Sequence, residues 1–152
     1  MTDGHILFIS SWYPTRTARF HGIFNRAFAQ AASLRATVSV IHVSPDDGVK
    51  SGFEFGKYMD GNVLTVQVYY PRASGIPIIG KLLQFRRRAL ACEAGLKVVL
   101  AERGKPSLVH LNVPIPAGPA AARLSRKLRI PLVVNECWTG YAPEDGRYRG
   151  VL

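Results

Sequence analysis

The chain has 152 residues and a formal net charge of +10, with 20 Lys and Arg against 10 Asp and Glu. Its length suits one domain with a sizeable core, and no apolar run approaches the ~20 residues that a membrane-spanning helix needs. The charge favours an anionic partner, which leaves nucleic acid, an anionic membrane surface or a phosphorylated substrate as the classes to weigh.

The cysteine content and the N-terminus bear on the compartment. Cys92 and Cys137 form neither a disulfide framework nor the spacing of a metal site, so we expect no metal. The chain begins without a basic leader and runs straight into a strand-like segment. We therefore expect a cytoplasmic protein.

The first apolar run, 5–11, has the continuous hydrophobicity of a parallel strand that is buried on both faces. A basic loop follows, and Gly22 opens a predicted helix over 23–34. Gly22 can bring the backbone close to a ligand at the positive end of that helix, although it can equally serve only to turn the chain. Neither a G-x-G-x-x-G fingerprint nor a Walker loop is present.

Residues 37–43 predict a second β-branched strand. The next segment, 53–70, differs in character because Asp60-Gly61 is a hairpin-turn dipeptide between two strand-like arms. Its second arm alternates apolar and polar residues with period two. We expect a small antiparallel excursion here, followed by a strand that rejoins the main sheet.

The longest predicted helix covers 81–103. Its core stripe, by three- and four-residue spacing, is Leu82, Phe85, Ala89, Cys92, Leu96 and Val99. Arg86, Arg87 and Arg88 lie outside or beside that stripe. They suit either a solvated helix face or contact with lipid phosphates.

The stretch 107–118 predicts a buried strand, a sharp turn with Pro114 and Pro116, and a helix that begins near Ala117. Ligands of parallel α/β sheets bind at the carboxyl ends of strands, where His110 and Asn112 lie. A structural role for a buried strand-end histidine is the alternative. The helix over 117–128 ends basic, with Arg123 and Arg126 on its outer face.

The last predicted strand, 130–135, runs into a polar and aromatic cluster that includes Glu136 and Trp138. The fold class that follows is α/β: a Rossmann-like three-layer sandwich with a mostly parallel sheet and an antiparallel excursion near 53–70. No predicted helix or strand closes the segment 142–152. We therefore expect residues 1–152 to be one domain of a longer protein.

Several segments together resemble the N-terminal, acceptor-binding domain of a family 4 glycosyltransferase with the GT-B architecture. The resemblance covers nearly the whole chain and rests on the order and spacing of four segments: Ser11-Trp12-Tyr13-Pro14; Gly22-Ile23-Phe24 with Ala29 and Ala32; Leu108-Val109-His110 running into Pro114 and Gly118; and Ile130-Pro131 leading to Glu136, Trp138, Thr139, Gly140 and Tyr141.

The resemblance implies a two-domain enzyme in which this half binds the acceptor and a C-terminal domain, absent from this chain, holds the nucleotide-sugar donor. Transfer would retain anomeric configuration without a metal, and this chain alone would be inactive. Acceptor binding would fall to Tyr13, His21, Asn112, Glu136 and Trp138, with Gly22 near the donor phosphates. No catalytic residue is assigned.

Two positions depart from the family pattern. Asn112 and Cys137 stand where members of the family often carry histidine. Asparagine can donate and accept hydrogen bonds but cannot titrate, so it can bind sugar hydroxyls at position 112 but cannot shuttle a proton there.

The charge fits this reading as attraction to an anionic membrane surface, since acceptors in the family are often lipid-linked or phosphorylated glycans. The basic residues expected to make that contact are Arg86, Arg87, Arg88, Arg123 and Arg126. The alternative is a basic nucleic-acid-binding or nucleotide-binding α/β module. No RNA-recognition sequence or zinc-finger spacing supports that alternative.

Overall fold

The computed structural model describes residues 4–73 and 77–137, which form one six-stranded sheet in the order β3-β4-β2-β1-β5-β6 with three helices. The edge strand β3 is antiparallel to β4, and every other pairing is parallel. The elements are β1 (His5–Ser10), α1 (Ile23–Ala32), β2 (Thr37–Pro45), β3 (Glu54–Asp60), β4 (Val63–Tyr70), α2 (Pro77–Arg103), β5 (Leu108–Asn112), α3 (Pro114–Leu128) and β6 (Leu132–Asn135).

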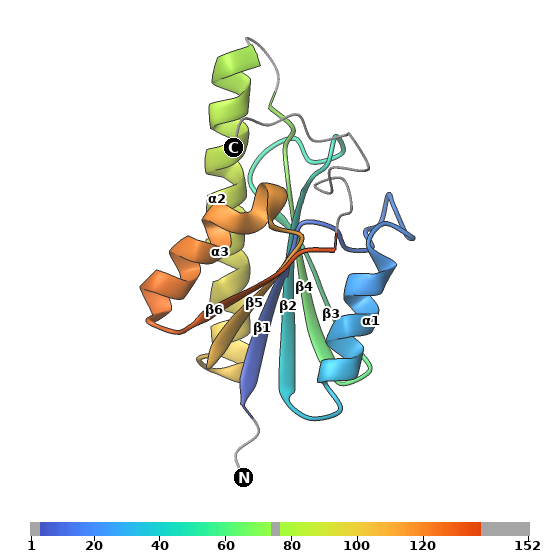
Figure 1. The fold of residues 1–152 in the computed structure, drawn as a ribbon. Coiled ribbons are helices and arrows are strands. Elements are labelled where there is room, and N and C mark those ends of the chain that lie inside the picture. The colour runs from blue at the N-terminus through green and yellow to red at the C-terminus, as the bar shows by residue number, and fades with distance from the viewer. Residues whose placement is uncertain (1–3, 74–76, 138–152) are drawn as a thin grey trace, which may run out of the picture.

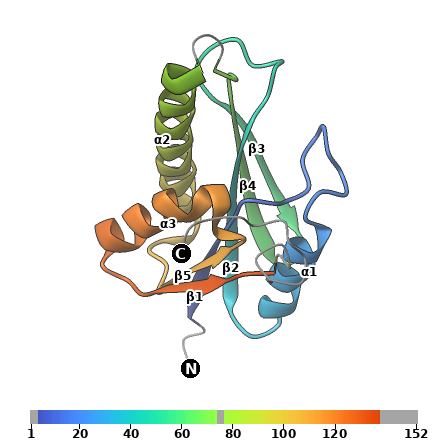
Figure 2. The same cartoon turned by 45° about the horizontal axis from the view of Figure 1, so that its top comes forward.

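The helices lie in two layers around the sheet. Helices α2 and α3 cover one face and α1 covers the other (Figures 1 and 2). This is the Rossmann-like three-layer sandwich that the alternating strand and helix patterns predict. Among the described residues, no helix is both long and apolar enough to cross a bilayer.

The core has one part on each side of the sheet. The larger cluster joins the strands to α2 and α3, and includes Leu7, Ile41 and Val68. The smaller cluster lies under α1 and includes Phe8, Tyr13 and Ala29. Burial of apolar surface on both faces explains the continuous apolar character of β1 and β2.

The antiparallel excursion is confirmed as the β3–β4 hairpin, with Gly61 in its turn at φ 61°. Strand β4 rejoins the sheet in parallel beside β2. All eight of its residues are buried, which a single apolar face did not predict. The reason is that the loop after β1 covers the polar face, where Gln67 Nε2 donates to the Pro14 carbonyl (2.5 Å) and the Arg16 backbone N–H donates to the Tyr69 hydroxyl (3.3 Å).

Helix α2 begins at Pro77, four residues before the predicted start, and its predicted core stripe is half right. Cys92, Leu96 and Val99 are buried, but Leu82 and Phe85 are 62% and 51% exposed. Figure 1 shows the cause: the N-terminal turns of α2 extend past α3. Apolar periodicity therefore continues along a part of the helix that has no sheet under it.

Helix α1 also differs from the sequence pattern, in which three- and four-residue spacing predicts one apolar stripe of Ile23, Phe24, Ala27, Phe28, Ala31 and Leu34. Its buried residues are Asn25 and Ala29, whereas Ile23 and Phe28 are 48% and 43% exposed. The small Ala29 packs on the strands, and Asn25 Nδ2 donates to the Trp12 carbonyl (2.7 Å). A polar anchor thus turns the helix away from the orientation that apolar spacing alone favours.

Candidate functional site

The carboxyl ends of β1, β5 and β6 lie side by side. Ser10 is in register with Asn112, and Asn112 with Asn135. Past the strand ends, the Ser11 N–H donates to the Asn112 carbonyl (3.2 Å), and the Val113 N–H donates to the Asn135 carbonyl (3.0 Å). The strand ends are therefore fixed relative to one another, at the edge where parallel sheets bind ligands.

A pocket of about 310 Å³ opens at this edge beside the ends of β1 and β2. We call it the strand-end pocket. Its wall includes Trp12, His21, Ser44, Arg72 and Arg88. The ring centroids of Trp12 and His21 are 5.8 Å apart. An aromatic ring, a hydroxyl and two guanidinium groups on one wall can bind a hydroxylated or anionic ligand.

The start of α1 is packed tightly on the loop that carries Trp12. A Cβ at Gly22 would lie 2.4 Å from the Trp12 carbonyl carbon and oxygen, and the Gly22 φ is +65°. Both facts require glycine at this position. Besides Asn25, the Ser10 hydroxyl donates to the Trp12 carbonyl (2.6 Å), so this loop is held from two sides. Gly22 therefore has a structural role, and its nearness to donor phosphates stays a prediction.

The start of α3 is tied to the same edge. The Ala117 N–H donates to the Ser11 hydroxyl (3.0 Å), which supplies a partner to the first turn of a helix whose N-cap residue, Val113, offers no side-chain cap. The backbone of Val113 has φ 54°, and Ile115 is non-helical within the helix. This kinked entry brings Pro116 into the wall of the strand-end pocket.

Tyr13, to which the resemblance assigns acceptor binding, is buried in this structure. Its side chain is 1% exposed and packs in the core under α1. Burial raises the pKa of its hydroxyl to about 12. Trp12, the preceding residue, faces the strand-end pocket instead. The sequence did not distinguish the two, because adjacent aromatic residues after a strand give no sign of which one turns inward.

Asn112 is also buried, at 0% exposure, so it offers no surface to an acceptor in this structure, and its predicted role stays a prediction. Its Oδ1 accepts a hydrogen bond from Asn135 Nδ2 (3.1 Å), which joins β5 to β6 beneath the sheet edge. This amide bridge explains what an uncharged side chain does at position 112: it links two strands where an ionisable group would meet a desolvation penalty.

His110 lies away from the strand-end pocket. Its ring packs edge-on against Phe8, with centroids 4.6 Å apart, and it lines a separate apolar hollow with Phe28 and Val133. Burial lowers its pKa. A structural role, the alternative to ligand binding, fits this packing better than binding at the carboxyl edge does.

The remaining predicted acceptor residues are His21, Glu136 and Trp138. His21 is exposed on the wall of the strand-end pocket. Glu136 is exposed just past β6. Trp138 lies outside the described residues, so its predicted role stays a prediction.

The five arginines predicted to face a membrane do not form one free basic face. Arg87 donates to the Pro71 carbonyl (2.9 Å), and Arg123 pairs with Glu93 (2.8 Å). Arg88 turns toward the strand-end pocket, while Arg86 and Arg126 are exposed. The triplet splits because α2 packs on the sheet with one side and consecutive residues are about 100° apart around a helix.

Besides Trp12, sequence reasoning missed His42 and Arg72 on the pocket wall. His42, near the end of β2, is 3% exposed, and its Nδ1–H donates to the Ser10 carbonyl (2.9 Å). Burial lowers its pKa to about 4. Arg72 follows β4 and pairs with Asp47 (2.9 Å). A histidine near the carboxyl end of an otherwise β-branched strand was the available signal.

Within residues 4–73 and 77–137, no group of three or more His, Cys, Asp or Glu side chains is placed to hold a metal ion. The basic wall of the strand-end pocket is also poorly suited to a cation. The site chemistry described above is therefore that of hydrogen-bond donors, an aromatic ring and guanidinium groups.

No protein-family model matches the chain, and no curated protein matches its sequence. Among solved structures, the fold is similar to the C-terminal domain of a hydrogenase from Pyrococcus furiosus, with a TM-score of 0.57 at 16% identity over 87% of this chain and 90% of that chain. This likeness supports the α/β fold. It gives no ground for a shared activity, since one fold serves many functions.

Proposed function

We propose that this domain is the acceptor-binding half of a retaining glycosyltransferase of the GT-B type. The enzyme transfers a sugar from a nucleotide-sugar donor to a glycan or lipid-linked acceptor. The observation that carries the proposal is the strand-end pocket, where Trp12 and His21 lie beside Arg72 and Arg88 at the carboxyl edge of the sheet. Sugar binding uses an aromatic face together with hydroxyl and charged hydrogen-bond partners, and this wall supplies both.

The donor and its phosphates are held by a second α/β domain that faces this edge. Transfer then requires the two substrates to be positioned together, the departing nucleotide to be stabilised and water to be excluded. This chain supplies the positioning of the acceptor. It lacks the second wall of the cleft, so it does not turn over donor alone.

We further propose that the enzyme works at the cytoplasmic face of an anionic membrane, and the net charge of +10 supports this proposal. The N-terminal turns of α2 support this, because exposed Ile78, Ile79 and Leu82 lie on the same helix as Lys81 and Arg86. Apolar side chains that enter the lipid boundary and cations that meet headgroups make a peripheral contact.

The test is a titration of the 152-residue chain with neutral and phosphorylated oligosaccharides and with UDP-glucose and GDP-mannose. Binding is measured by tryptophan fluorescence and by calorimetry. We expect saccharide binding that Trp12→Ala weakens about fivefold, as for ~1 kcal/mol of ring contact. Phe20→Ala is the matched control, because Phe20 is 83% exposed on the same loop and does not line the pocket.

Three results would count against the proposal. Turnover of a nucleotide sugar by this chain alone contradicts the claim that the chain is inactive without the donor domain. Tight nucleotide binding with no saccharide binding favours a nucleotide-binding module. A gel shift with a steep salt slope favours the nucleic-acid alternative.

A further inference from the structure

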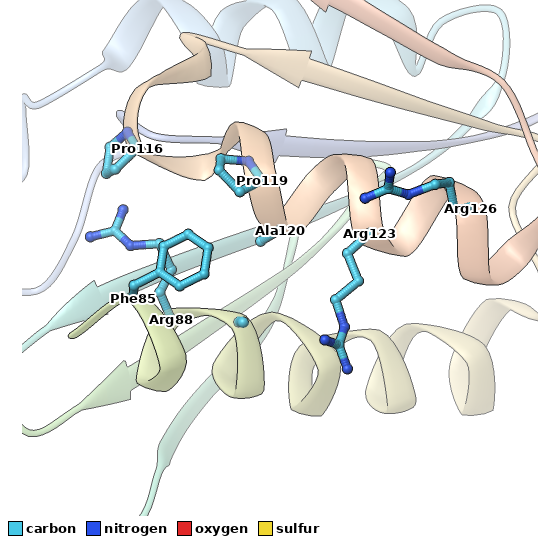
Figure 3. Close-up of a pocket in the computed structure, with 8 residues that line it drawn as sticks. Phe85, Arg88, Pro116, Pro119, Ala120, Arg123 and Arg126 are labelled. Atoms are coloured by element: carbon cyan, nitrogen blue, oxygen red, sulfur yellow. The ribbon is translucent and has the colours of Figure 1, made fainter. Parts of the chain in front are cut away.

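A second pocket of about 310 Å³ lies between α2 and α3. We call it the helix groove. Figure 3 shows Phe85 and Arg88 on α2 facing Pro116 and Pro119 at the start of α3, with Arg123 and Arg126 further along that helix. Arg88 and Pro116 line both this groove and the strand-end pocket. The two hollows therefore meet at one guanidinium group.

Every ionisable side chain that lines either hollow is basic. The two walls carry Arg72, Arg88, Arg123 and Arg126 with His21 and His42, and no described Asp or Glu lines them. Arg72 and Arg123 have carboxylate partners, Asp47 and Glu93. No ion pair of Arg88 or Arg126 is present among the described residues, so their charge remains available to an anion.

Arg88 is half-buried and its charge acts on two buried groups. Burial lowers the pKa of His42, and Arg88 is among the charges that lower it further. Burial raises the pKa of the Tyr70 hydroxyl, and Arg88 opposes that rise. A guanidinium held this close to apolar surroundings binds an incoming anion more strongly than a fully solvated one, because less water intervenes.

The other half of the groove is apolar. Phe85, Ala89, Pro116, Pro119 and Ala120 make up the rest of its wall. A bare phosphate ion would leave these surfaces unused. An apolar group attached to the anion would cover them, and the exposed Leu82, one turn before Phe85, extends the same surface toward the start of α2.

We propose that the helix groove binds the phosphate of an amphiphilic phosphate ester, with Arg88 bonded to the phosphate, Arg126 beside it and the apolar group against Phe85. The proposal deepens the proposed function and rests on it: the acceptor is a phosphorylated lipid whose polar end enters the strand-end pocket past Arg88. Arg88 is a positioning residue, since it holds the phosphate so that the adjoining sugar reaches the carboxyl edge.

The experiment titrates the 152-residue chain with decyl phosphate below its micelle concentration, with inorganic phosphate and with decyl maltoside, and follows each by calorimetry. We expect decyl phosphate to bind more tightly than either other probe. Arg88→Gln should weaken it about tenfold or more, as for a lost charge-assisted hydrogen bond. Arg126→Gln should weaken it less. Lys97→Gln removes a charge from an exposed position of the same helix, away from both hollows, and should leave the affinity unchanged.

If inorganic phosphate binds as tightly as decyl phosphate, the claim that the groove also binds an apolar group is wrong. Equal binding of decyl maltoside would overturn the phosphate half. An unchanged affinity in Arg88→Gln would remove Arg88 from the site, with urea unfolding as the check that the variant is folded. If Arg88→Gln does not fold, the test uses the exposed Arg126 instead. An unchanged affinity for decyl phosphate in Arg126→Gln would then reject the helix groove as the binding site.

These outcomes are separable from those of the proposed function. Loss of the decyl phosphate effect with saccharide binding intact rejects the lipid phosphate and keeps the acceptor domain. Tight decyl phosphate binding without any saccharide binding supports the groove and rejects the transferase role.

Discussion

The carbonyl of Ser10 links the sheet edge to His42. A carbonyl oxygen can only accept, so His42 Nδ1 carries a proton and the neutral ring is held as that tautomer. With its side chain 3% exposed, the ring cannot gain a second proton without losing solvation. Its pKa, lowered to about 4 by burial, expresses that cost. A group of this kind makes folding depend on pH.

His42 should make the protein less stable as the pH falls from about 6.5 to about 4. In that window the unfolded chain binds a proton at His42 and the folded chain does not, so the free energy of unfolding falls on acidification. Its contribution to the slope is about 1.4 kcal/mol per pH unit. His42→Asn keeps an N–H donor for Ser10 but cannot titrate, and should flatten the slope by that amount in urea unfolding between pH 4 and 7.

Some slope should remain in His42→Asn, because burial also lowers the pKa values of His5 and His110. A variant whose unfolding free energy follows the wild-type pH curve would show that His42 gains its proton in the folded state.

At the scale of elements, two junctions decide the site: the packing of α1 on the loop after β1, and the projection of α2 past the sheet. At the first junction, Gly22 meets the Trp12 carbonyl at a distance that no side chain allows. At the second, Leu82 and Phe85 continue an apolar pattern into solvent. Each junction leads to a prediction.

Gly22→Ala should destabilise the protein by about 3 kcal/mol or more. The substitution adds a methyl group 2.4 Å from backbone atoms of Trp12, which cannot move aside as a flexible side chain would, and it forces alanine to φ +65°. Gly61→Ala is the control, since it has φ +61° with nothing within 4 Å. That variant should lose only about 1 kcal/mol from its left-handed conformation. Equal losses of unfolding free energy in the two variants would mean that the loop carrying Trp12 moves to accommodate the methyl group.

The N-terminal turns of α2 should bind anionic vesicles. Ile79→Ser with Leu82→Ser should lower co-sedimentation with phosphatidylglycerol-containing vesicles about tenfold, because two side chains that are 61% and 62% exposed no longer enter the lipid boundary. Leu34→Ser is the control, since Leu34 is 77% exposed just after α1, the helix that covers the opposite face of the sheet from α2 (Figure 1). Binding that ignores anionic lipid content, or an equal effect of Leu34→Ser, would reject this contact.

The sequence predicts some features of these elements and not others. The α/β class, the three layers and the antiparallel hairpin follow from apolar runs, the Asp60-Gly61 turn and the strand–helix alternation, because burial on both faces leaves a direct trace in composition. Which side of a helix is buried did not follow for α1, where the anchor is Asn25 donating to a carbonyl. It did not follow for the start of α2 either, because periodicity does not report where the sheet ends.

The location of the site could be predicted from the sequence, but most of the side chains that line it could not. The rule for parallel sheets located the carboxyl edge, and His21 does line a pocket there. Tyr13 and Asn112 are buried at that edge, and Trp12, His42 and Arg88 take the wall instead. Side-chain direction in the turns after strands depends on tertiary hydrogen bonds, such as the one that the Ala117 N–H donates to the Ser11 hydroxyl, and no local pattern encodes these bonds.

At the scale of the whole molecule, the sheet and α2 share one core, and Cys92 lies inside it. Its side chain is 0% exposed, and burial raises the pKa of its thiol to about 12. Cys137, in contrast, is exposed just after β6. The two thiols therefore report different events, since the thiolate is the reactive form and the reagent must reach it.

The native protein should show one fast thiol with Ellman's reagent near pH 8 and a second that reacts only as α2 separates from the sheet. Cys137→Ser should remove the fast phase and leave the slow one. The slow rate follows global opening of the core, so 1 M urea should raise it about fivefold or more.

A ligand that binds the folded state should lower the reaction rate of Cys92 by mass action. Decyl phosphate at ten times its dissociation constant should therefore slow Cys92 about tenfold in the wild-type protein. The same concentration should not slow Cys92 in Arg88→Gln. Two fast thiols in native buffer would mean that α2 does not hold the core closed, and that the groove it forms with α3 is not a fixed surface.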